Sequence, residues 1–301
     1  MEYIPAKTIV TATKSREWFG IDYNMNIYRG CCHGCIYCDS RSDCYQIEDF
    51  DRVRAKENAL SIIRNDLRRK VRTGVVGTGA MSDPYNPYEK KLLLTRHALE
   101  LIDAFNFGAA IATKSTLLLR DLDILQTIRE HSPVLCKITI TTADDKLSKK
   151  LEPGVPASKE RFSMIDTLRQ AGIFSGILLM PVLPWLEDSD ENIHSLVRHA
   201  HEAGACFIYA AFGMTLRGNQ RDWYYRQLDR LFPDQGLADR YRRQYGYQYE
   251  CRSPHASRLW KLFARECERY GILYRMKDII PAYQKKYQMT QLRLFDFPNN
   301  L

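Results

Sequence analysis

The chain has 301 residues, of which 45% are hydrophobic and 27% charged, and its formal net charge is +8 at pH 7. This composition predicts a soluble, globular protein with one substantial core. No run of about 18 apolar residues occurs, and the first residues lack the apolar core of a signal peptide, so we expect no membrane contact and a cytoplasmic location.

Apolar strand patterns alternate with helical patterns along most of the chain. Residues 1–27 form an approach segment, and its end at 22–28 alternates polar and apolar residues as a first strand would. Five more strands are expected at 74–79, 109–115, 135–142, 176–182 and 206–212. Helices are expected at 54–70, 96–105, 122–131, 159–172 and 192–204.

Six such strands separated by helices predict an α/β protein with a parallel sheet covered by helices. The pattern fits a barrel and a doubly wound sheet equally well. A barrel would place polar residues that end strands at one functional face. Lys114 closes the apolar run 109–112, where a charged amine needs an anion or a water-filled cavity.

Three cysteines at residues 31, 35 and 38 have the spacing C-x3-C-x2-C, with Gly30 and Gly34 beside the first two. Three thiolates at this spacing suit a four-iron cluster with one open iron, and glycines allow the tight curl that such a loop needs. The alternative is structural zinc, for which His33 or Cys44 would supply the fourth ligand.

The motif resembles the radical S-adenosylmethionine (SAM) superfamily, because an aromatic residue, Tyr37, precedes its last cysteine. The resemblance implies that Cys31, Cys35 and Cys38 bind a [4Fe–4S] cluster and that SAM chelates the fourth iron. It also implies that Tyr37 lies against the adenine, and that the fold is a partial (β/α)6 barrel. Cys32 lies off the pattern.

Several further blocks resemble spore photoproduct lyase and its relatives. They are GTGAMSDPYNPYE at 77–89, LTR at 94–96, TKS at 113–115, LRD at 119–121 and LEPG at 151–154 with Arg161. The resemblance implies a SAM pocket and a reductant such as flavodoxin or ferredoxin. Its pocket residues would be Ser82 and Asp83, Lys114 at the SAM carboxylate with Ser115 nearby, and Thr139 under the ribose.

One position departs from that family. Photoproduct lyases carry a cysteine just before the Ser-Asp pair, which returns a hydrogen atom to the repaired thymine. Here the residues before Ser82 are Gly79, Ala80 and Met81, without a thiol. The resemblance therefore supports the initiation of radical chemistry and leaves the substrate open.

The basic surplus is confined to the C-terminal part of the chain. Residues 216–301 hold 17 Lys and Arg against 9 Asp and Glu, whereas residues 1–215 hold 27 of each. We therefore divide the chain into a barrel at 28–215, a helical basic extension at 216–288 and a tail at 289–301.

Residues 236–249 of the extension interleave arginine with tyrosine, as single-strand or flipped-base binding requires. The helix expected at 257–270 places Arg258, Lys261, Arg265 and Arg269 on one side. A solvated helix face covering the open side of the barrel is the alternative interpretation of these charges.

In the tail, Gln291, Leu292, Leu294 and Phe295 resemble the peptide that bacterial proteins insert into the DNA sliding clamp. A tail that straps the barrel is the alternative.

The sequence thus predicts an enzyme that cleaves SAM reductively to a 5′-deoxyadenosyl radical and acts on nucleic acid, with DNA repair as one such role. Radical modification of a protein or small molecule is the first alternative. The second is a metal-cluster adaptor, without enzyme activity, that docks on a DNA-processing partner.

Overall fold

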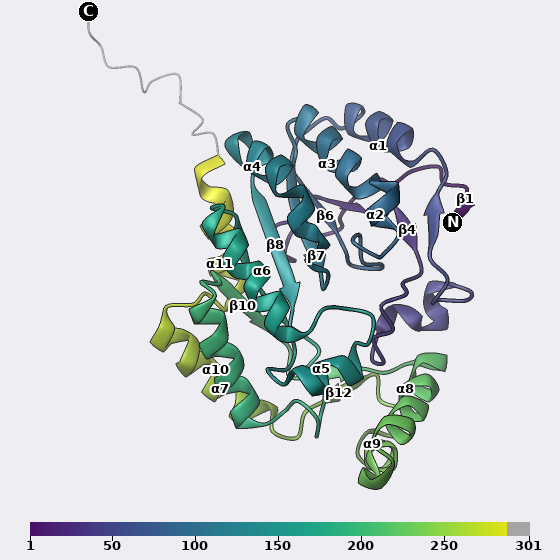
Figure 1. Cartoon of the computed structure of the whole chain (residues 1–301), viewed down its shortest axis with the longest axis vertical. Helices are drawn as coiled ribbons and strands as arrows, with labels where there is room; N and C mark the ends of the chain where they lie inside the picture. The colour runs from purple at the N-terminus through teal and green to yellow at the C-terminus, as the bar shows by residue number, and fades with distance from the viewer. Residues whose placement is uncertain (288–301) are drawn as a thin grey trace, which may run out of the picture.

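The computed structural model describes residues 1–287, and its centre is a seven-stranded sheet (Figure 1). The strand order is β10-β9-β8-β7-β6-β3-β2, and all neighbours pair in parallel except β2 with β3. The strands are β2 (Val10–Ala12), β3 (Tyr23–Met25), β6 (Val75–Thr78), β7 (Gly108–Thr113), β8 (Val134–Thr139), β9 (Phe174–Leu179) and β10 (Phe207–Ala210).

Helices between the strands cover the outer face of this sheet. They are α1 (Ala59–Arg68), α3 (Leu94–Ala104), α4 (Leu122–His131), α6 (Ser158–Gln170) and α7 (Asp190–Glu202). Outward-facing strand residues such as Ile111, Ile138 and Ile177 pack against these helices in the largest buried apolar cluster. The six parallel strands follow one another in chain order, and the predicted partial barrel with a helical C-terminal region is confirmed.

The inner face of the sheet has its own apolar cluster, built from alternate strand residues such as Ala110, Leu135 and Phe207. Ile279 and Tyr283 of α11 (Met276–Gln284) complete this cluster. Helix α11 therefore covers part of the inner face of the sheet, and residues on both sides of the expected division at 216 share one core.

The approach to the cysteine run differs from the prediction. The single strand expected at 22–28 is two strands, because β4 (Tyr28–Arg29) leaves the main sheet and joins β1 (Glu2–Ile4) and β5 (Arg54–Lys56) in a small sheet. The helix expected at 54–70 is therefore shorter than predicted. Its first residues form the strand β5, and α1 spans only Ala59–Arg68. Pairing between β4 and β5 is non-local, so periodicity within either segment could not indicate it.

Up to residue 287, the C-terminal region contains a two-stranded sheet and four α-helices. The strand β11 (Gly213–Thr215) pairs with β12 (Glu250–Arg252), and between them α8 (Gly218–Leu231) packs on α9 (Leu237–Tyr245). The predicted helix at 257–270 is α10 (Ala256–Tyr270), which packs on α7. Its four basic residues are exposed, and Arg258 pairs with Asp190 at 2.8 Å.

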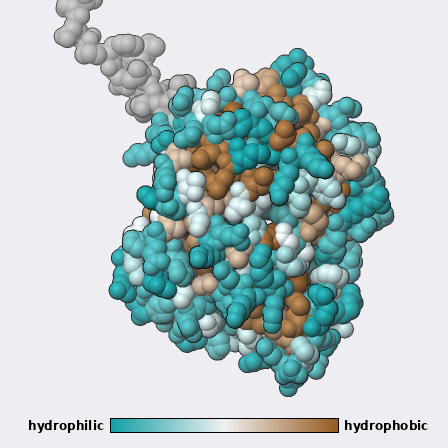
Figure 2. All heavy atoms as spheres, viewed as in Figure 1, coloured by the Kyte–Doolittle hydropathy of each residue, from teal (hydrophilic) through white to brown (hydrophobic). Residues whose placement is uncertain are grey.

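The tail at 289–301, with the clamp-like residues Gln291, Leu292, Leu294 and Phe295, lies outside the described residues. Across residues 1–287, none of the helices combines the length and apolarity needed to span a bilayer. Hydrophilic residues cover most of the face in Figure 2, with apolar patches between them.

Lys137 is a charged residue in the barrel interior. It lies on β8 between the inward-facing Leu135 and Thr139, is 2% exposed, and its Nζ lies 5.0 Å from the centre of the Phe19 ring. Burial lowers the pKa of Lys137 to about 7. In the unfolded chain the amine titrates near its ordinary value of 10.5.

We predict that Lys137→Met raises the free energy of unfolding at pH 7 by a few kcal/mol, because about 1.4 kcal/mol accompanies each unit of pKa difference. Between the two pKa values the unfolded chain holds one more proton, so this residue makes stability rise with pH there. Urea unfolding at pH 7 and pH 9 measures both effects, with the exposed Lys277→Met as control. An unchanged pH slope in Lys137→Met would contradict the prediction.

Candidate active site at the cysteine loop

The start of the cysteine loop is held by the segment that precedes β5. Gly30 follows β4 with a φ of 79°, and a Cβ there would lie 2.7 Å from the carbonyl oxygens of Phe50 and Arg52. The next residue, Cys31, donates its N–H to the Phe50 oxygen at 2.8 Å. Only glycine allows this approach and this φ together, so the predicted role of Gly30 in the curl is confirmed.

The other side of the loop packs on residues 151–154. The Ile36 N–H donates to the Leu151 oxygen at 3.0 Å, and the Gly154 N–H donates to the His33 oxygen at 2.9 Å. A Cβ on Gly154 would lie 2.6 Å from that same His33 oxygen. The LEPG motif therefore has a local function, which is to bind the backbone of the cysteine loop.

The three cysteines of the motif line one cavity of about 150 Å³. Among residues 1–287, no three His, Cys, Asp or Glu side chains converge on a single ion position. A structural zinc ion needs four such ligands at one point, whereas three thiolates that bind different irons of one cluster do not have to converge. Three thiols around one cavity are the donor set of a four-iron cluster with one open iron, and His33, one of the two candidate zinc ligands, lines the same cavity. Cys44 is exposed and lies outside the cavity lining.

Lys114 follows β7 and lines the same cavity. Its Nζ lies 5.7 Å from the centre of the Tyr37 ring and 4.0 Å from the nearest oxygen of Glu152. Burial opposes the charge on this amine, but the neighbouring Cys35 and Glu152 outweigh it and raise the pKa of Lys114 above its ordinary value. Lys114 therefore places an amine in the lining of the cavity that the three cysteines share.

Asp83 lines the cavity, and both of its carboxylate oxygens accept hydrogen bonds from the end of β7. One carboxylate oxygen accepts the Thr113 hydroxyl at 2.7 Å, and the other accepts the Lys114 N–H at 2.9 Å. His33 Nδ1 lies 3.4 Å from the second oxygen. Asp83 therefore fixes the backbone that carries Lys114.

The three predicted hydroxyl residues separate into two groups. Ser82 and Thr139 line the cavity, and the Ser82 hydroxyl donates to the Gly30 oxygen at 2.5 Å. Ser115 instead accepts an N–H of the 3-10 helix that it caps, and it lines a different hollow of about 390 Å³. The structure therefore places Ser115 outside the predicted pocket.

Glu152 and Arg161 are the residues whose role sequence reasoning missed. Both are fully buried, and an Arg161 Nη lies 2.5 Å from a Glu152 oxygen. The Tyr37 hydroxyl donates to Glu152 as well. Both residues belong to blocks that resemble photoproduct lyase, but those blocks alone do not indicate that the two side chains pair beneath the cavity.

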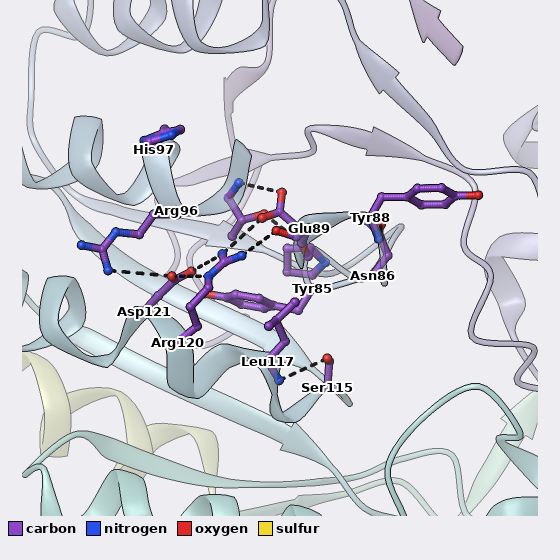
Figure 3. A network of polar contacts seen from close by, with 12 residues as sticks. Tyr85, Asn86, Tyr88, Glu89, Arg96, His97, Ser115, Leu117, Arg120 and Asp121 are labelled. Atoms are coloured by element: carbon purple, nitrogen blue, oxygen red, sulfur yellow. Dashed lines mark hydrogen bonds and ion pairs between the residues drawn. The ribbon is translucent and has the colours of Figure 1, made fainter. Parts of the chain in front are cut away.

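A second polar network fixes the loop between β6 and α3 (Figure 3). Glu89 is fully buried, and Arg120 donates to its carboxylate at 3.2 Å and to its backbone oxygen at 2.6 Å. Arg120 also contacts Asp121 at 2.7 Å. Because the Tyr28 hydroxyl donates to Glu89, this network links the loop that carries Ser82 to the strand before the cysteines.

A larger cavity of about 440 Å³ adjoins the first, and both are lined by Tyr37, Cys38 and Lys114. Apolar residues from the ends of β9 and β10 form part of its wall. The strands β11 and β12 supply further lining residues, including Glu250 and Arg252, and Asp39, Ser40 and Ala80 complete the lining.

The C-terminal region also holds the residues next to the third cysteine. Arg217 donates to an Asp39 oxygen at 2.6 Å, and Thr215 donates to the other oxygen at 3.0 Å. Gln220 of α8 donates to the Tyr37 backbone oxygen at 3.3 Å. The basic extension thus forms one wall of the large cavity and contacts the cysteine loop directly.

The tyrosines of the 236–249 stretch differ in exposure. Tyr241 and Tyr245 are buried in a cluster with α8, so they cannot supply the stacking faces that the sequence suggested. Tyr247 is 96% exposed and Tyr249 is 46% exposed. Any stacking surface is therefore limited to these two residues.

The sequence profile of the radical SAM superfamily matches residues 25–197. An uncharacterised protein of Mycobacterium tuberculosis is 34% identical over 230 residues, which cover 74% of this chain and 67% of the relative. An uncharacterised protein of Methanocaldococcus jannaschii is 34% identical over 188 residues, 62% of this chain and 68% of the relative.

Solved structures of spore photoproduct lyase share the fold. The complex with dinucleoside spore photoproduct has a TM-score of 0.66 and 14% identity, covering 91% of this chain and 81% of that one. A double mutant with bound AdoMet and the same dinucleoside has a TM-score of 0.65 and 15% identity, covering 88% and 78%. At this identity the likeness establishes the fold alone.

We predict that Gly154→Ala destabilises the cysteine loop by about 1–3 kcal/mol, because the added Cβ forces the His33 backbone away. Iron bound per chain after anaerobic reconstitution measures the effect and should fall. Lys150→Ala, on the exposed face of the neighbouring α5 (Asp145–Leu151), should retain the parent iron content. Full iron content in Gly154→Ala would refute the role assigned to the LEPG motif.

Proposed function

The chain belongs to the radical SAM superfamily, and from this premise we propose that it is an enzyme acting on a nucleic-acid substrate. Members of the superfamily use a [4Fe–4S] cluster and SAM and need a reductant. When bound and reduced, these cofactors supply a 5′-deoxyadenosyl radical that abstracts hydrogen from a substrate. The residues of the protein bind both cofactors, orient the substrate and exclude water.

Cys31, Cys35 and Cys38 are the cluster ligands in this proposal, which leaves one iron for SAM. The observation that supports the assignment is that all three line one cavity while backbone contacts hold both sides of their loop. Cys32 instead packs against the main apolar cluster. The electron donor is flavodoxin or ferredoxin.

The cluster would occupy the 150 Å³ cavity that the three thiols line, and the SAM site would extend from it into the adjoining 440 Å³ cavity, which Tyr37, Cys38 and Lys114 also line. Lys114 binds the SAM carboxylate, because its amine is in the cavity lining and charge-assisted hydrogen bonds recognise carboxylates strongly. Tyr37 lies against the adenine, and Thr139 contacts the ribose. Ser82 lines the site, and Asp83 acts by fixing the Lys114 backbone.

The adjoining 440 Å³ cavity also holds the substrate, at the end away from the thiols. It reaches Lys114 and Cys38 at its inner end, where the radical would form, and its outer end is lined by Glu250 and Arg252. Apolar walls with a few polar groups at one end suit a planar base. Enzymes that act on a base unstack it into such a pocket.

The basic extension supplies the contacts for the rest of the strand. Arg243 and Tyr247 are exposed on and beside α9, and Arg243 lines a surface hollow with Trp185 and His255. Arginine beside exposed aromatic rings is the combination that binds single strands. The likeness to a lyase solved with a dinucleoside photoproduct agrees with this substrate class.

The substrate is a nucleic acid other than spore photoproduct. Ala80 lines both cavities at the block where photoproduct lyases place their hydrogen-donating cysteine. Cys44, Cys136, Cys206, Cys251 and Cys267 are absent from the linings of these two cavities. We therefore expect a different lesion or a base modification.

We predict that the protein binds single-stranded DNA with an affinity that falls steeply with salt. Tyr247→Ala should weaken binding about tenfold through lost stacking, and Arg243→Gln should lower the salt slope by about 0.7. Fluorescence anisotropy with a labelled oligonucleotide at several salt concentrations measures both changes.

The matched control is Arg269→Gln on α10, because Arg269 already lies 3.7 Å from Glu266. It should leave the affinity and the slope unchanged. Binding that does not depend on salt, or equal losses in the control and the α9 variants, would refute a nucleic-acid interface at α9. A protein or small-molecule substrate would then be favoured.

A further inference from the structure

We propose that Glu152 and Arg161 form a buried positioning pair that sets the three walls of the SAM site together. This inference rests on the proposed SAM site. The residues assigned to the adenine, the carboxylate and the ribose come from three separate segments, which are the cysteine loop, the end of β7 and the end of β8. A common anchor would keep their relative positions constant.

The contacts of the pair reach each of these segments. One Glu152 oxygen accepts the Tyr37 hydroxyl and lies 4.0 Å from Lys114 Nζ. The other accepts an Arg161 Nη at 2.5 Å, and the second Nη of Arg161 donates to the Thr139 backbone oxygen at 2.6 Å. A single ion pair therefore links the cysteine loop, the end of β7 and the end of β8.

A contribution to the stability of the fold does not explain why these two charged residues are buried together. Glu152 is 1% exposed and Arg161 is 0% exposed, and removing two charges from water costs several kcal/mol for each ion. Apolar replacements of buried pairs are often neutral or stabilising. The directional contacts with the cavity-lining segments are what an apolar pair could not supply.

The pair also determines where the charge of Lys114 acts. Arg161 neutralises Glu152 at close range, and Ser148 accepts a further hydrogen bond from Arg161. Lys114 consequently lies at 4.0 Å, beyond hydrogen-bond range, and its ammonium hydrogens remain available to a carboxylate in the cavity. Without Arg161, the unpaired Glu152 would attract Lys114 away from the cavity.

The test is the dissociation constant of SAM, measured by anaerobic equilibrium dialysis on the reconstituted protein and expressed per cluster. Arg161→Met should raise the dissociation constant of SAM about tenfold, because Lys114 turns to the unpaired Glu152 carboxylate. The double variant Glu152→Gln/Arg161→Met removes that competitor but still lacks the link from Arg161 to Thr139, so its dissociation constant should recover only in part and stay about threefold above the parent value. Tyr37→Phe removes the hydrogen bond to Glu152 without changing the charge of the site. It should raise the dissociation constant of SAM about fivefold.

Glu187→Gln is the matched control. Glu187 is another fully buried carboxyl, and its contacts are with Thr141 at 2.6 Å and the Leu183 N–H at 3.0 Å. Burial raises its pKa to about 8, so near pH 7 it is protonated and glutamine resembles it closely. This variant should bind SAM as the parent does.

Iron content and the change in the EPR signal of the reduced cluster on adding SAM separate a positioning role from a structural one. Parent-like SAM affinity in cluster-loaded Arg161→Met, or in the cluster-loaded double variant, would overturn the proposal. If Arg161→Met loses its cluster, an unchanged SAM affinity in Tyr37→Phe would overturn it instead. Failure of the parent to bind SAM at its cluster would refute the proposed function, which is a distinguishable result.

Discussion

The packing of the cysteine loop between two backbone segments is the constraint on which the rest of the site depends. Phe50 and Arg52 approach Gly30 on one side, and Leu151 and Gly154 bind the loop on the other. Three thiols on a short, glycine-containing loop would otherwise have many conformations, and ordering each residue costs about 1–2 kcal/mol. The contacts with these two segments restrict the conformations of the loop.

The barrel brings the remaining groups to this loop. Parallel strands end at one edge, so Lys114 after β7 and Thr139 at the end of β8 meet the thiols there. The C-terminal region closes the same edge, since Thr215 and Arg217 bind the residue that follows Cys38. The cofactor loop, the strand ends and the basic extension thus form one continuous site.

Much of this arrangement was predictable from local patterns. The C-x3-C-x2-C spacing indicated which thiols lie together, and the glycines beside them indicated a tightly curled loop. An amine at the end of an apolar run indicated that Lys114 faces a cavity. The departure of β4 from the main sheet and the Glu152–Arg161 pair depend on contacts between distant segments, which periodicity does not encode. The sequence did not indicate that Tyr241 is buried, because arginine and tyrosine can alternate in the same way on a surface and in a core.

The most direct test of the account is whether SAM is cleaved at a cluster held by these three cysteines. The anaerobically reconstituted protein, given SAM and dithionite, should bind about four irons and release 5′-deoxyadenosine, detected by mass spectrometry. Cys31→Ala, Cys35→Ala and Cys38→Ala should each abolish the product, and Cys44→Ala should not. Intact SAM beside a full cluster, or zinc in place of iron, would contradict the account.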